Sequence, residues 1–276
     1  MKKSGLGPAL RELRESSGLE AKAVARSAVM SRSKLSKIEN GKTAPSVTDV
    51  DCILTAIGVS DEVKGEYMAA VREATTEVTA WRLVRRLGYS RKQEQVKALE
   101  SQTTLLRLFQ HSLVPGLLQT PEYVRAVFAG KGLTEAQLER TVGVRLARQS
   151  ILYSEEKAFR FIITESVLRW RIVAPLVMAG QLDRLISVSR LPGVDIGIVG
   201  LSAAQTEFPG HSFSIKDERT VTVEMIHAET VMTDPRDIAL YVAKFERFSG
   251  VAVSGDDMRT LIAAIRDELF REQETV

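Results

Sequence analysis

The sequence predicts a mainly α-helical protein in two parts, an all-α N-terminal domain and an α+β C-terminal domain with a small, largely antiparallel sheet. Two observations lead to this prediction. The first sixty residues divide into short segments in which apolar residues recur at helical spacing, with Ser or Gly at their ends. Beyond about residue 100, short runs of β-branched and aromatic residues alternate with longer helical patterns.

Length and composition are those of a globular protein with room for two domains. The chain has 276 residues, of which 44% are hydrophobic and 26% charged. It has no run of eighteen apolar residues, and its beginning, MKKSGLGPALRELRES, lacks the apolar core of a signal peptide. Cys52 is the single cysteine, so no internal disulfide is possible. We therefore expect a cytoplasmic protein that makes no membrane contact.

Short helices are expected throughout the N-terminal domain. Leu6 and Leu10 lie on one face of the first helix, which Gly18 ends. Ser31 is placed to cap the third helix, and Ser46 begins the fourth with a capping-box pattern. The second to fifth helices are expected at about 20–28, 31–40, 46–57 and 60–76.

The segment 21–45, AKAVARSAVMSRSKLSKIENGKTAP, predicts two short helices joined by a tight turn. Leu35 and Ile38 form the inner face of the second helix, which leaves small, polar and basic side chains outward. In a helix-turn-helix, the second helix enters the major groove of double-stranded DNA. The residues predicted to contact DNA are Ser31, Arg32, Ser33, Lys34, Ser36, Lys37, Asn40 and Lys42.

The chemistry of these residues suits both bases and phosphates. Arg32 and Lys37 are able to donate to guanine O6 and N7. We expect the turn at Asn40, with Lys42, to offer free backbone N–H groups and an ammonium to phosphate. Residues 1–60 carry ten Lys or Arg against six Asp or Glu, so the positive charge lies on this part of the chain. The alternative is a helix-turn-helix used only for protein contacts.

The run SRSKLSKIENGKTAPS strongly resembles the signature of the Xre/Cro/C1-type helix-turn-helix regulators, over roughly residues 5–60. The resemblance implies sequence-specific DNA binding. Two departures stand out. Glu20 and Ala21 replace the Ser or Thr cap and the following polar residue, so a phosphate contact is lost. Val29 stands where the turn usually has Gly, and because a β-branched residue with positive φ is strained, we expect the turn to take another form.

A connector is expected at 77–100, between a helix-turn-helix domain at 1–76 and a regulatory or dimerisation domain at 101–276. Its stretch 81–92, WRLVRRLGYSRK, has five basic residues and no acidic one, and a helical pattern resumes at about Lys92. One interpretation is a solvated linker helix. The other is an additional segment that contacts phosphate.

The C-terminal domain is expected to alternate strands and helices. Pro121 suits the first position of a helix capped by Thr120, and Pro175 interrupts a later helix. Further helices are expected at 134–151, 167–189, 235–249 and 255–273. Strands are expected at 103–110, 159–165, 194–200, 212–216, 220–226 and 230–233.

The run LVPGLLQTPEYVRAVF (113–128) is the most distinctive part of this domain. Over about 100–272 the chain resembles an uncharacterised domain, with a PGLLQT motif, that follows Xre-type modules in many actinobacterial regulators. Arg145 and Arg148 lie on one helix face and are able to pair with Glu165 or Glu122. These polar residues form either a network that holds a helix to the sheet or a pocket for a ligand or partner. The candidate pocket residues are Gln119, Tyr123, Arg145, Arg148, Gln149 and Glu165.

No pattern in the sequence indicates an enzyme. His111, His211 and His227 are scattered without metal-ligand spacing, and nucleophile-elbow and zincin motifs are absent. We expect no metal, no cofactor and no catalytic residues. The predicted function is a DNA-binding transcriptional regulator, a homodimer whose C-terminal domain senses an effector or partner. The alternative, also implied by the resemblance, is an antitoxin-like protein that mainly binds a small partner protein encoded nearby.

Overall fold

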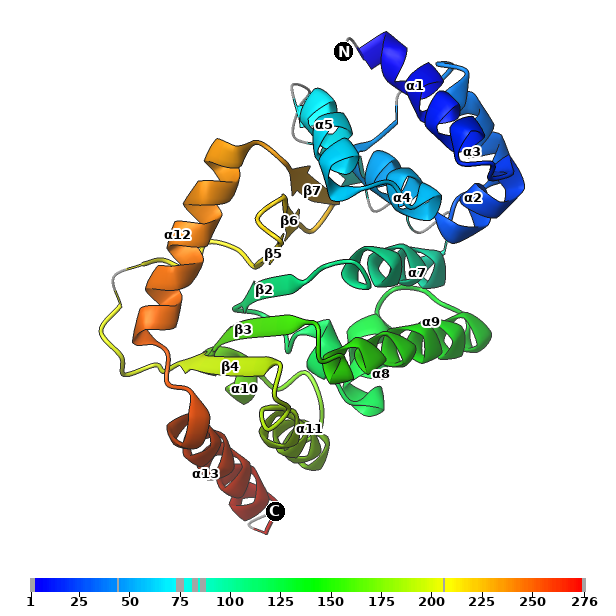
Figure 1. Cartoon of the computed structure of the whole chain (residues 1–276). Coiled ribbons are helices and arrows are strands. Elements are labelled where there is room, and N and C mark those ends of the chain that lie inside the picture. The colour runs from blue at the N-terminus through cyan, green and yellow to red at the C-terminus, as the bar shows by residue number, and fades with distance from the viewer. Residues whose placement is uncertain are drawn as a thin grey trace.

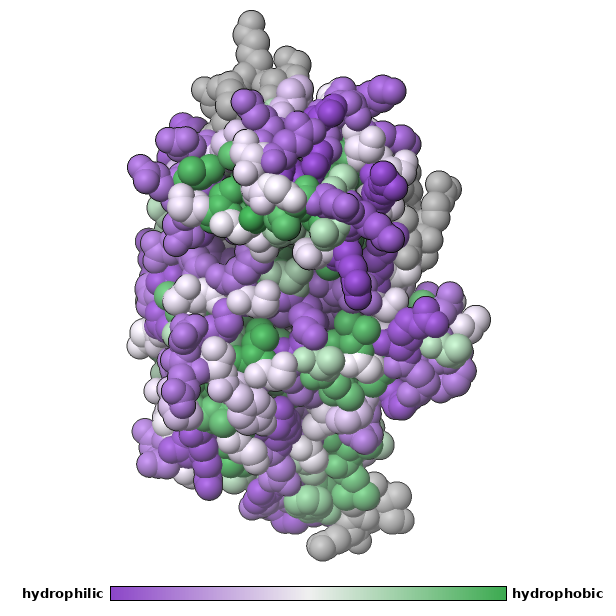
Figure 2. All heavy atoms as spheres, turned by 45° about the vertical axis from the view of Figure 1, so that its right-hand side comes forward, coloured by the Kyte–Doolittle hydropathy of each residue, from purple (hydrophilic) through white to green (hydrophobic). Residues whose placement is uncertain are grey.

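The computed structural model describes residues 3–43, 45–72, 77–80, 84, 88–205 and 207–274. A bundle of short helices lies at one end of the molecule, a sheet lies in the middle, and the C-terminal helix lies at the opposite end (Figure 1). Hydrophilic residues are spread over the face seen in Figure 2, with smaller apolar patches among them. Within the described residues, no helix is both long enough and apolar enough to cross a membrane.

The N-terminal bundle forms largely as its sequence predicts, because its helix ends are specified locally. Ser31 accepts a hydrogen bond from the backbone of Lys34, and Ser46 with Asp49 forms a complete capping box. Gly58 ends its helix in the left-handed conformation, with φ of 76°. The helices described here are α1 (Lys3–Ser16), α2 (Ala21–Ser27), α3 (Arg32–Glu39), α4 (Val47–Ile57) and α5 (Asp61–Arg72).

The interior of the bundle is apolar and closely packed. Leu10, Leu35 and Ile38 are fully buried in one cluster with residues of α4. A Cβ atom at Gly7 would lie 2.0 Å from the carbonyl oxygen of Ile38, so α1 approaches α3 at a distance that only glycine allows. This close contact fixes the position of α3 in the bundle.

Among the described residues, one seven-stranded sheet has the order β1-β7-β6-β5-β2-β3-β4. Our expectation of a largely antiparallel sheet is wrong, because β2, β3 and β4 pair in parallel and the sheet is mixed. Helical crossovers join these three strands, whereas β5, β6 and β7 follow one another as an antiparallel meander. The strands are β1 (Glu77–Ala80), β2 (Leu105–Gln110), β3 (Ala158–Thr164), β4 (Val194–Val199), β5 (Phe213–Lys216), β6 (Thr220–Glu224) and β7 (Ala228–Met232).

The expected strand positions of the C-terminal part are confirmed, whereas β1 lies where no strand was expected. The expected helices are confirmed too, including the cap at Thr120 and the break before Pro175. The helical elements after β1 are α7 (Tyr89–Glu100), η1 (Gly116–Leu118), α8 (Pro121–Ala129), α9 (Glu135–Arg148), η2 (Gln149–Tyr153), α10 (Glu165–Arg169), α11 (Pro175–Val188), α12 (Pro235–Val251) and α13 (Gly255–Glu274).

Two apolar layers cover the sheet. On one face α12 packs Phe245 and Phe248 against the strands, and the rings of Phe248 and Phe109 lie 4.2 Å apart. On the other face η1, α10, α11 and α13 cover β2, β3 and β4 around Phe161 and Ile196. In Figure 1, α12 stands on one side of the sheet and α8, α9 and α11 on the other.

The second face of the meander is different, because polar residues alternate with the apolar residues that face α12. Lys216 of β5 and Thr220 of β6 are register partners on this face, as are Glu224 of β6 and Glu229 of β7. Helix α7 lies above this face with Gln93 and Glu100 buried, so the described part of the predicted connector is not a solvated linker helix. Half of the basic stretch 81–92, with three of its five basic residues, lies outside the described residues.

Candidate functional site

The predicted DNA-contacting residues lie on the outer surface of α3 and its two ends. Six of the eight side chains are exposed with no ion pair among the described residues: Arg32, Ser33, Ser36, Lys37, Asn40 and Lys42. Ser31 is exposed as well, but its hydroxyl is the cap of α3, with Oγ 3.1 Å from the backbone nitrogen of Lys34. The exposed cations Arg32, Lys37 and Lys42 therefore form one basic surface, which we call the α3 surface.

Lys34 differs from the other predicted contacts. Its Nζ lies 2.6 Å from Oδ1 of Asp49, the residue that closes the capping box of α4. The lysine side chain is 43% exposed, so the pair sits at the edge of the α3 surface. Lys34 therefore links α3 to α4, and Asp49 partly neutralises its charge.

The turn after α3 does not offer the free backbone N–H groups that we expected. The N–H groups of Gly41, Lys42 and Thr43 donate to the carbonyls of Ile38 and Lys37, at 2.8 to 3.2 Å. The αL conformation of Gly41, with φ of 67°, closes the helix this way. What remains for a phosphate oxygen is the ammonium of Lys42.

An ion pair that sequence reasoning missed holds α3 from behind. Arg14 of α1 donates with Nε and Nη2 to the two carboxylate oxygens of Glu39, at 2.6 and 3.0 Å. The two side chains are only 11% and 6% exposed. One feature of the sequence could have indicated this pair. Arg14 follows Leu10 by four residues, so it lies on the apolar face of its helix, where a charged side chain needs a partner.

The turn before α3 keeps the left-handed conformation, with Val29 at φ of 52°. Our expectation that the turn would take another form is therefore wrong, and the chain holds a β-branched residue in a strained conformation. At the start of α2, Glu20 is the N-cap residue and its side chain makes no capping hydrogen bond. The Ser or Thr cap typical of the family is thus not replaced by a glutamate cap, and the loss of a phosphate contact at Ala21 stays a prediction.

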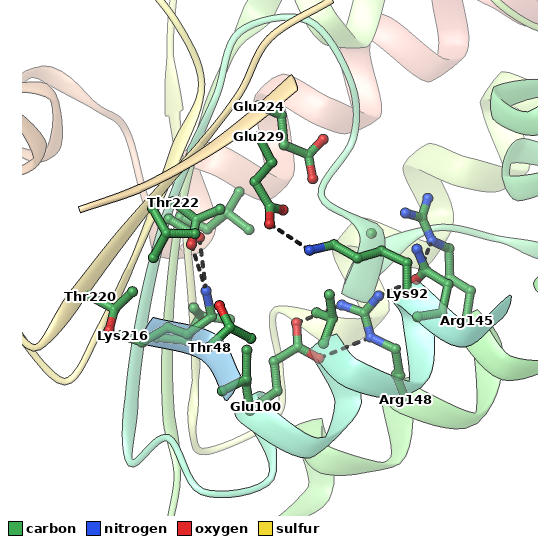
Figure 3. A pocket seen from close by; sticks show the side chains of 18 of the residues that line it. Thr48, Lys92, Glu100, Arg145, Arg148, Lys216, Thr220, Thr222, Glu224 and Glu229 are labelled. Carbon is green, nitrogen blue, oxygen red and sulfur yellow. Dashed lines mark hydrogen bonds and ion pairs between the residues drawn. The ribbon is translucent and has the colours of Figure 1, made fainter. Parts of the chain in front are cut away.

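A cavity of about 700 Å³ lies between the polar face of the sheet, helix α7 and the helix-turn-helix bundle. The bundle contributes Val47 and Thr48 of α4, and α9 contributes Arg145 and Arg148. Figure 3 shows side chains from the strands, from α7 and α9, and from α4 directed toward the same space. The cavity is large enough for a small-molecule ligand, since such pockets measure roughly 300–1,000 Å³.

Three ion pairs stand in the wall of this cavity. Arg148 donates to both oxygens of Glu100, at 2.6 and 3.0 Å, and also to Gln93. Lys92 Nζ lies 2.5 Å from Glu229 Oε1, so this residue of the basic stretch points inward and is not free for DNA phosphate. The third pair joins Lys64 to Asp51 at the bundle side, with Lys64 Nζ 2.8 Å from Asp51 Oδ1.

Five charged residues that line the cavity have no ion pair among the described residues: Lys131 and Asp217, and three that face its interior, Lys216, Glu224 and Arg145. Lys216 Nζ donates only to the hydroxyls of Ser214 and Thr222, each at 3.3 Å, and no described carboxylate lies within ion-pair distance. Burial lowers the pKa of Lys216. The pKa of Glu224 is raised by desolvation of its carboxyl at the cavity and by its register partner Glu229, although the residue as a whole is exposed. Glu224 is open to the cavity, and Figure 3 draws no described partner for its carboxylate.

Arg145 is the third group, and its partners are neutral. Its Nη1 and Nε donate to the amide oxygens of Gln119 and Gln93, at 2.9 and 3.2 Å. Its guanidinium lies over the ring of Phe128, 4.8 Å from the centroid. Burial lowers its pKa to about 10, with a further contribution from Arg148, so Arg145 remains charged at neutral pH.

The structure divides the candidate pocket residues into three groups. Arg145, Arg148 and Gln119 line the cavity. Tyr123 and Gln149 lie behind the wall, where Tyr123 accepts from the backbone of Val114 and Gln149 donates to the carbonyl of Gln119 at 2.7 Å. These two hold the PGLLQT segment and are satisfied polar groups of the core.

Glu165 lies elsewhere, so the pairing of Arg145 or Arg148 with it is wrong. Its carboxylate accepts from Arg169 at 2.7 Å and from the backbone of Leu201 at 2.9 Å. Glu122, the other suggested partner, is exposed on α8. The actual carboxylate partner of Arg148 is Glu100, which sequence reasoning placed in the connector.

Candidate catalytic groups are sparse in the described part of the chain. His111 Nδ1 lies 2.8 Å from Ser212 Oγ, but no described carboxylate contacts His111 to orient it. Burial lowers the pKa of the His111 imidazole. Burial also raises the pKa of the Cys52 thiol to about 12, so the thiol is protonated at neutral pH. Within the described residues, no group of three or more His, Cys, Asp or Glu side chains is placed to hold a metal ion.

Comparison with protein families gives two matches. Residues 6–64 match a model described as a helix-turn-helix domain. Residues 93–264, more than half of the chain, match a model described as a domain of unknown function (DUF5753). No curated protein sequence matches the chain.

Similarity to solved structures is remote. One is TrmBL2, an archaeal chromatin protein whose structure is described as showing a novel mode of DNA binding. It has 12% identity and a TM-score of 0.34, with 70% of this chain and 59% of that chain covered. Another is Nuc, a phospholipase D family member from Salmonella typhimurium, with 10% identity, a TM-score of 0.32, and 66% and 97% coverage. At these scores neither likeness carries an argument about this chain.

Proposed function

The chain belongs to the family defined by the domain of unknown function (DUF5753), here preceded by a helix-turn-helix domain, and we propose that it is a sequence-specific transcriptional regulator of the Xre type. The α3 surface carries this proposal. It presents Arg32, Lys37 and Lys42 outward on a short helix that Gly7 and the Arg14–Glu39 pair hold from behind. This is the arrangement needed by a helix that enters the major groove.

The outward residues divide by role. Arg32 lies in the first turn of α3, the end that approaches base edges, and Arg is able to form bidentate hydrogen bonds with guanine. Lys42 lies beyond the C-terminal end of α3 and supplies a phosphate contact. Lys37 lies between Arg32 and Lys42, where its charge is available to a base or to a phosphate. We propose that Arg32 carries sequence readout and that Lys42 sets register on the DNA backbone.

The test begins with the DNA sites that the protein occupies across its genome. On the best site, Arg32→Ala is expected to lose roughly 10- to 100-fold in preference over a scrambled sequence, the range of about 1–3 kcal/mol for one base contact. Lys42→Ala is expected to weaken both DNAs equally. Arg236→Ala is the matched control, because Arg236 is 89% exposed and lies on α12. If Arg32→Ala keeps the full preference in a competition assay, the assignment is wrong.

The oligomeric state follows from the size of the contact. One short recognition helix reads few base pairs, so we propose a homodimer on two half-sites about 10 bp apart. Light scattering of the free protein and of its DNA complex tests this. The alternative is that a small partner protein encoded nearby is the main ligand. A stoichiometric small protein in material purified from native lysate would support that alternative.

We also propose that the chain acts by binding and not by catalysis, in the cytoplasm. The support is the His111–Ser212 contact, which lacks an orienting carboxylate among the described residues, and the protonated, buried thiol of Cys52. A regulator in the cytoplasm needs neither group. Turnover of ester or phosphodiester substrates that Ser212→Ala abolishes would contradict this proposal.

A further inference from the structure

We propose that the cavity between the sheet and the bundle binds a small organic anion with an apolar body, and that the bound molecule bridges the sheet and α4. The bridging part rests on the proposed function, because only a DNA-binding protein could use it for regulation. The binding part stands on the cavity alone. Four observations lead to the proposal: unbalanced charge, an apolar wall, the position of Lys216, and the path from the cavity to α3.

The charges that line the cavity do not balance. Each of Arg148, Lys92 and Lys64 has a carboxylate within 2.8 Å. Lys216 and Arg145 have only hydroxyl and amide partners among the described residues. Because buried charges are normally paired, two cations facing one cavity with neutral partners call for an anion from outside the chain.

The single carboxyl of Glu224 balances at most one of these two cations. It sits opposite Glu229 across two strands, where like charges at paired positions repel each other, and its pKa is raised. At least one cation, Lys216 or Arg145, is therefore left for an anionic ligand with several acceptor atoms.

The rest of the wall is apolar. Leu108 of β2, Val96 and Leu99 of α7, and Val127 and Phe128 of α8 all line the cavity. Ten or so ring or chain carbons would find van der Waals partners there, while a free inorganic ion would leave most of the volume unused. This mixture favours an organic anion over phosphate or sulfate.

The position of Lys216 argues against a purely structural role. Its strand is central in the sheet, between β6 and β2, and an apolar residue there would pack against Leu106, its register partner. A lysine at this place carries a desolvation penalty without an ion pair. Residues that lower stability at a cavity wall are those expected to serve binding.

The path from the cavity to the α3 surface is short. Thr48 lines the cavity, and the next residue, Asp49, pairs with Lys34 of α3 at 2.6 Å. The contact between bundle and sheet domain includes polar pairs, with Lys64 Nζ 3.0 Å from Gln102 Oε1 and Arg219 3.8 Å from Asp61, beside Leu99 of α7, which packs against the bundle core. Polar contacts of this kind between domains allow relative motion, so a molecule that touches both sides changes the placement of α3.

The test uses two fluorescent probes of nearly equal shape. The anion 1-anilino-8-naphthalenesulfonate carries a sulfonate, and N-phenyl-1-naphthylamine lacks it. The full chain is expected to bind one molecule of the anion. Lys216→Met is expected to weaken the anion at least tenfold, as for loss of a charge-assisted hydrogen bond, and the neutral probe less than twofold. Lys97→Met, on the exposed side of α7, is the matched control and is expected to change neither.

Stability measurements keep this test independent of folding. Lys216→Met is expected to keep or raise the melting temperature, because it removes a half-buried charge that has no described ion pair. A lower melting temperature together with unchanged anion binding would show a structural lysine and overturn the proposal. Thr48→Trp serves as a second variant, because it fills the cavity from α4 and is expected to weaken both probes. The proposal would also be overturned if the two probes bound the wild type with equal affinity and no variant changed the affinity of either probe.

A last arm tests the bridge. DNA affinity is measured on the best genomic site with and without saturating anionic probe. The probe is expected to change the DNA affinity of the wild type at least threefold and to leave the DNA affinity of Lys216→Met unchanged. One-to-one probe binding with DNA affinity unchanged would overturn the bridge. Failure to bind any specific DNA would overturn the proposed function instead, and the probe titrations, which contain no DNA, separate the two failures.

Discussion

The α3 surface and the cavity use similar side chains in opposite ways. In the bundle, Arg32, Lys37 and Lys42 point to solvent, and the one described buried pair, Arg14–Glu39, lies behind α3. In the cavity, Lys216 and Arg145 point inward and lack carboxylate partners among the described residues. Solvent and salt screen the charge of an outward cation. An inward cation lies in a medium of lower dielectric constant, where its attraction to an anion is stronger.

This difference in direction indicates what kind of anion could neutralise the cations of each region. In the proposed function, the α3 surface meets DNA, which is a dense line of negative charge, so several loosely held cations are enough. In the proposed ligand binding, the cavity holds one small molecule by a few fixed groups. The following predictions test whether inward and outward charges of this chain do behave differently.

The largest effect is expected from breaking the buried ion pairs. Arg14→Ala in the bundle and Arg148→Ala in the cavity wall each leave a carboxylate buried and unpaired, with exposed fractions of 6% for Glu39 and 7% for Glu100. Each is expected to lower the free energy of unfolding by about 3–5 kcal/mol. Hydrogen exchange of amides in α1–α4 and in α7–α9 measures the two regions separately.

The control for these variants is an exposed pair in the same bundle. Arg11 and Glu15 are 50% and 53% exposed, and Arg11→Ala is expected to leave the stability essentially unchanged. A loss under about 1 kcal/mol for Arg14→Ala would mean that Glu39 finds another partner or water. The account of how α3 is held would then fail.

A smaller effect is expected at the strained turn. Val29 has φ of 52°, and glycine adopts this conformation without penalty. Val29→Gly is therefore expected to raise the stability of the bundle by about 1 kcal/mol, measured by urea unfolding. Val63→Gly, in the helix α5, is the matched control and is expected to lower stability. Destabilisation by Val29→Gly would mean that packing of the valine side chain outweighs the strain.

The helix cap at Glu20 offers a comparable gain. Its side chain makes no hydrogen bond to the first turn of α2, and serine would do so. Glu20→Ser is expected to add about 0.5–1 kcal/mol and to strengthen DNA binding slightly by removing a negative charge near the α3 surface. Glu62→Ser, in the first turn of α5, is a control for the charge change without the cap. Equal stability of Glu20→Ser and the wild type would show that water caps the helix as well.

The smallest effect is a pH dependence within the cavity. The pKa of Glu224 is raised above the ordinary 4.5, so its contribution to stability is fully present below about pH 4.5 and is lost as the pH rises through the raised value. Glu229, Arg145, Lys92 and Arg148 are the charged groups around it. Glu224→Gln is expected to match the wild type at pH 4 and to be the more stable protein at pH 7. Parallel stability curves for the two proteins would contradict the assignment.

Sequence patterns predicted what is decided locally. The caps at Ser31, Ser46 and Thr120, the break at Pro175 and the apolar face with Leu35 each depend on residues within one or two turns. The strand positions were predictable for the same reason, since β-branched and apolar runs mark them. The parallel pairing of β2, β3 and β4 was not, because it depends on how the crossovers pack.

The cavity could not be predicted, because its parts are far apart in the chain. Arg148 and Glu100 are separated by 48 residues, and Lys92 and Glu229 by 137. The alternation of Ser214 and Lys216 with apolar neighbours predicts strands with one polar face, but the pattern cannot distinguish a face toward solvent from a face toward a cavity. The one sequence feature that could have indicated the cavity was the number of charged residues in the predicted strands.

The central claim is that the outward cations of α3 touch DNA while the inward cations of the cavity do not. The most direct measurement is the slope of log affinity against log salt for one DNA site, with the wild type, Lys42→Met and Lys216→Met. Lys42→Met is expected to lower the slope by about 0.9, the value for one phosphate contact, and Lys216→Met to leave it unchanged. An unchanged slope for Lys42→Met, or a lowered slope for Lys216→Met, would contradict the account.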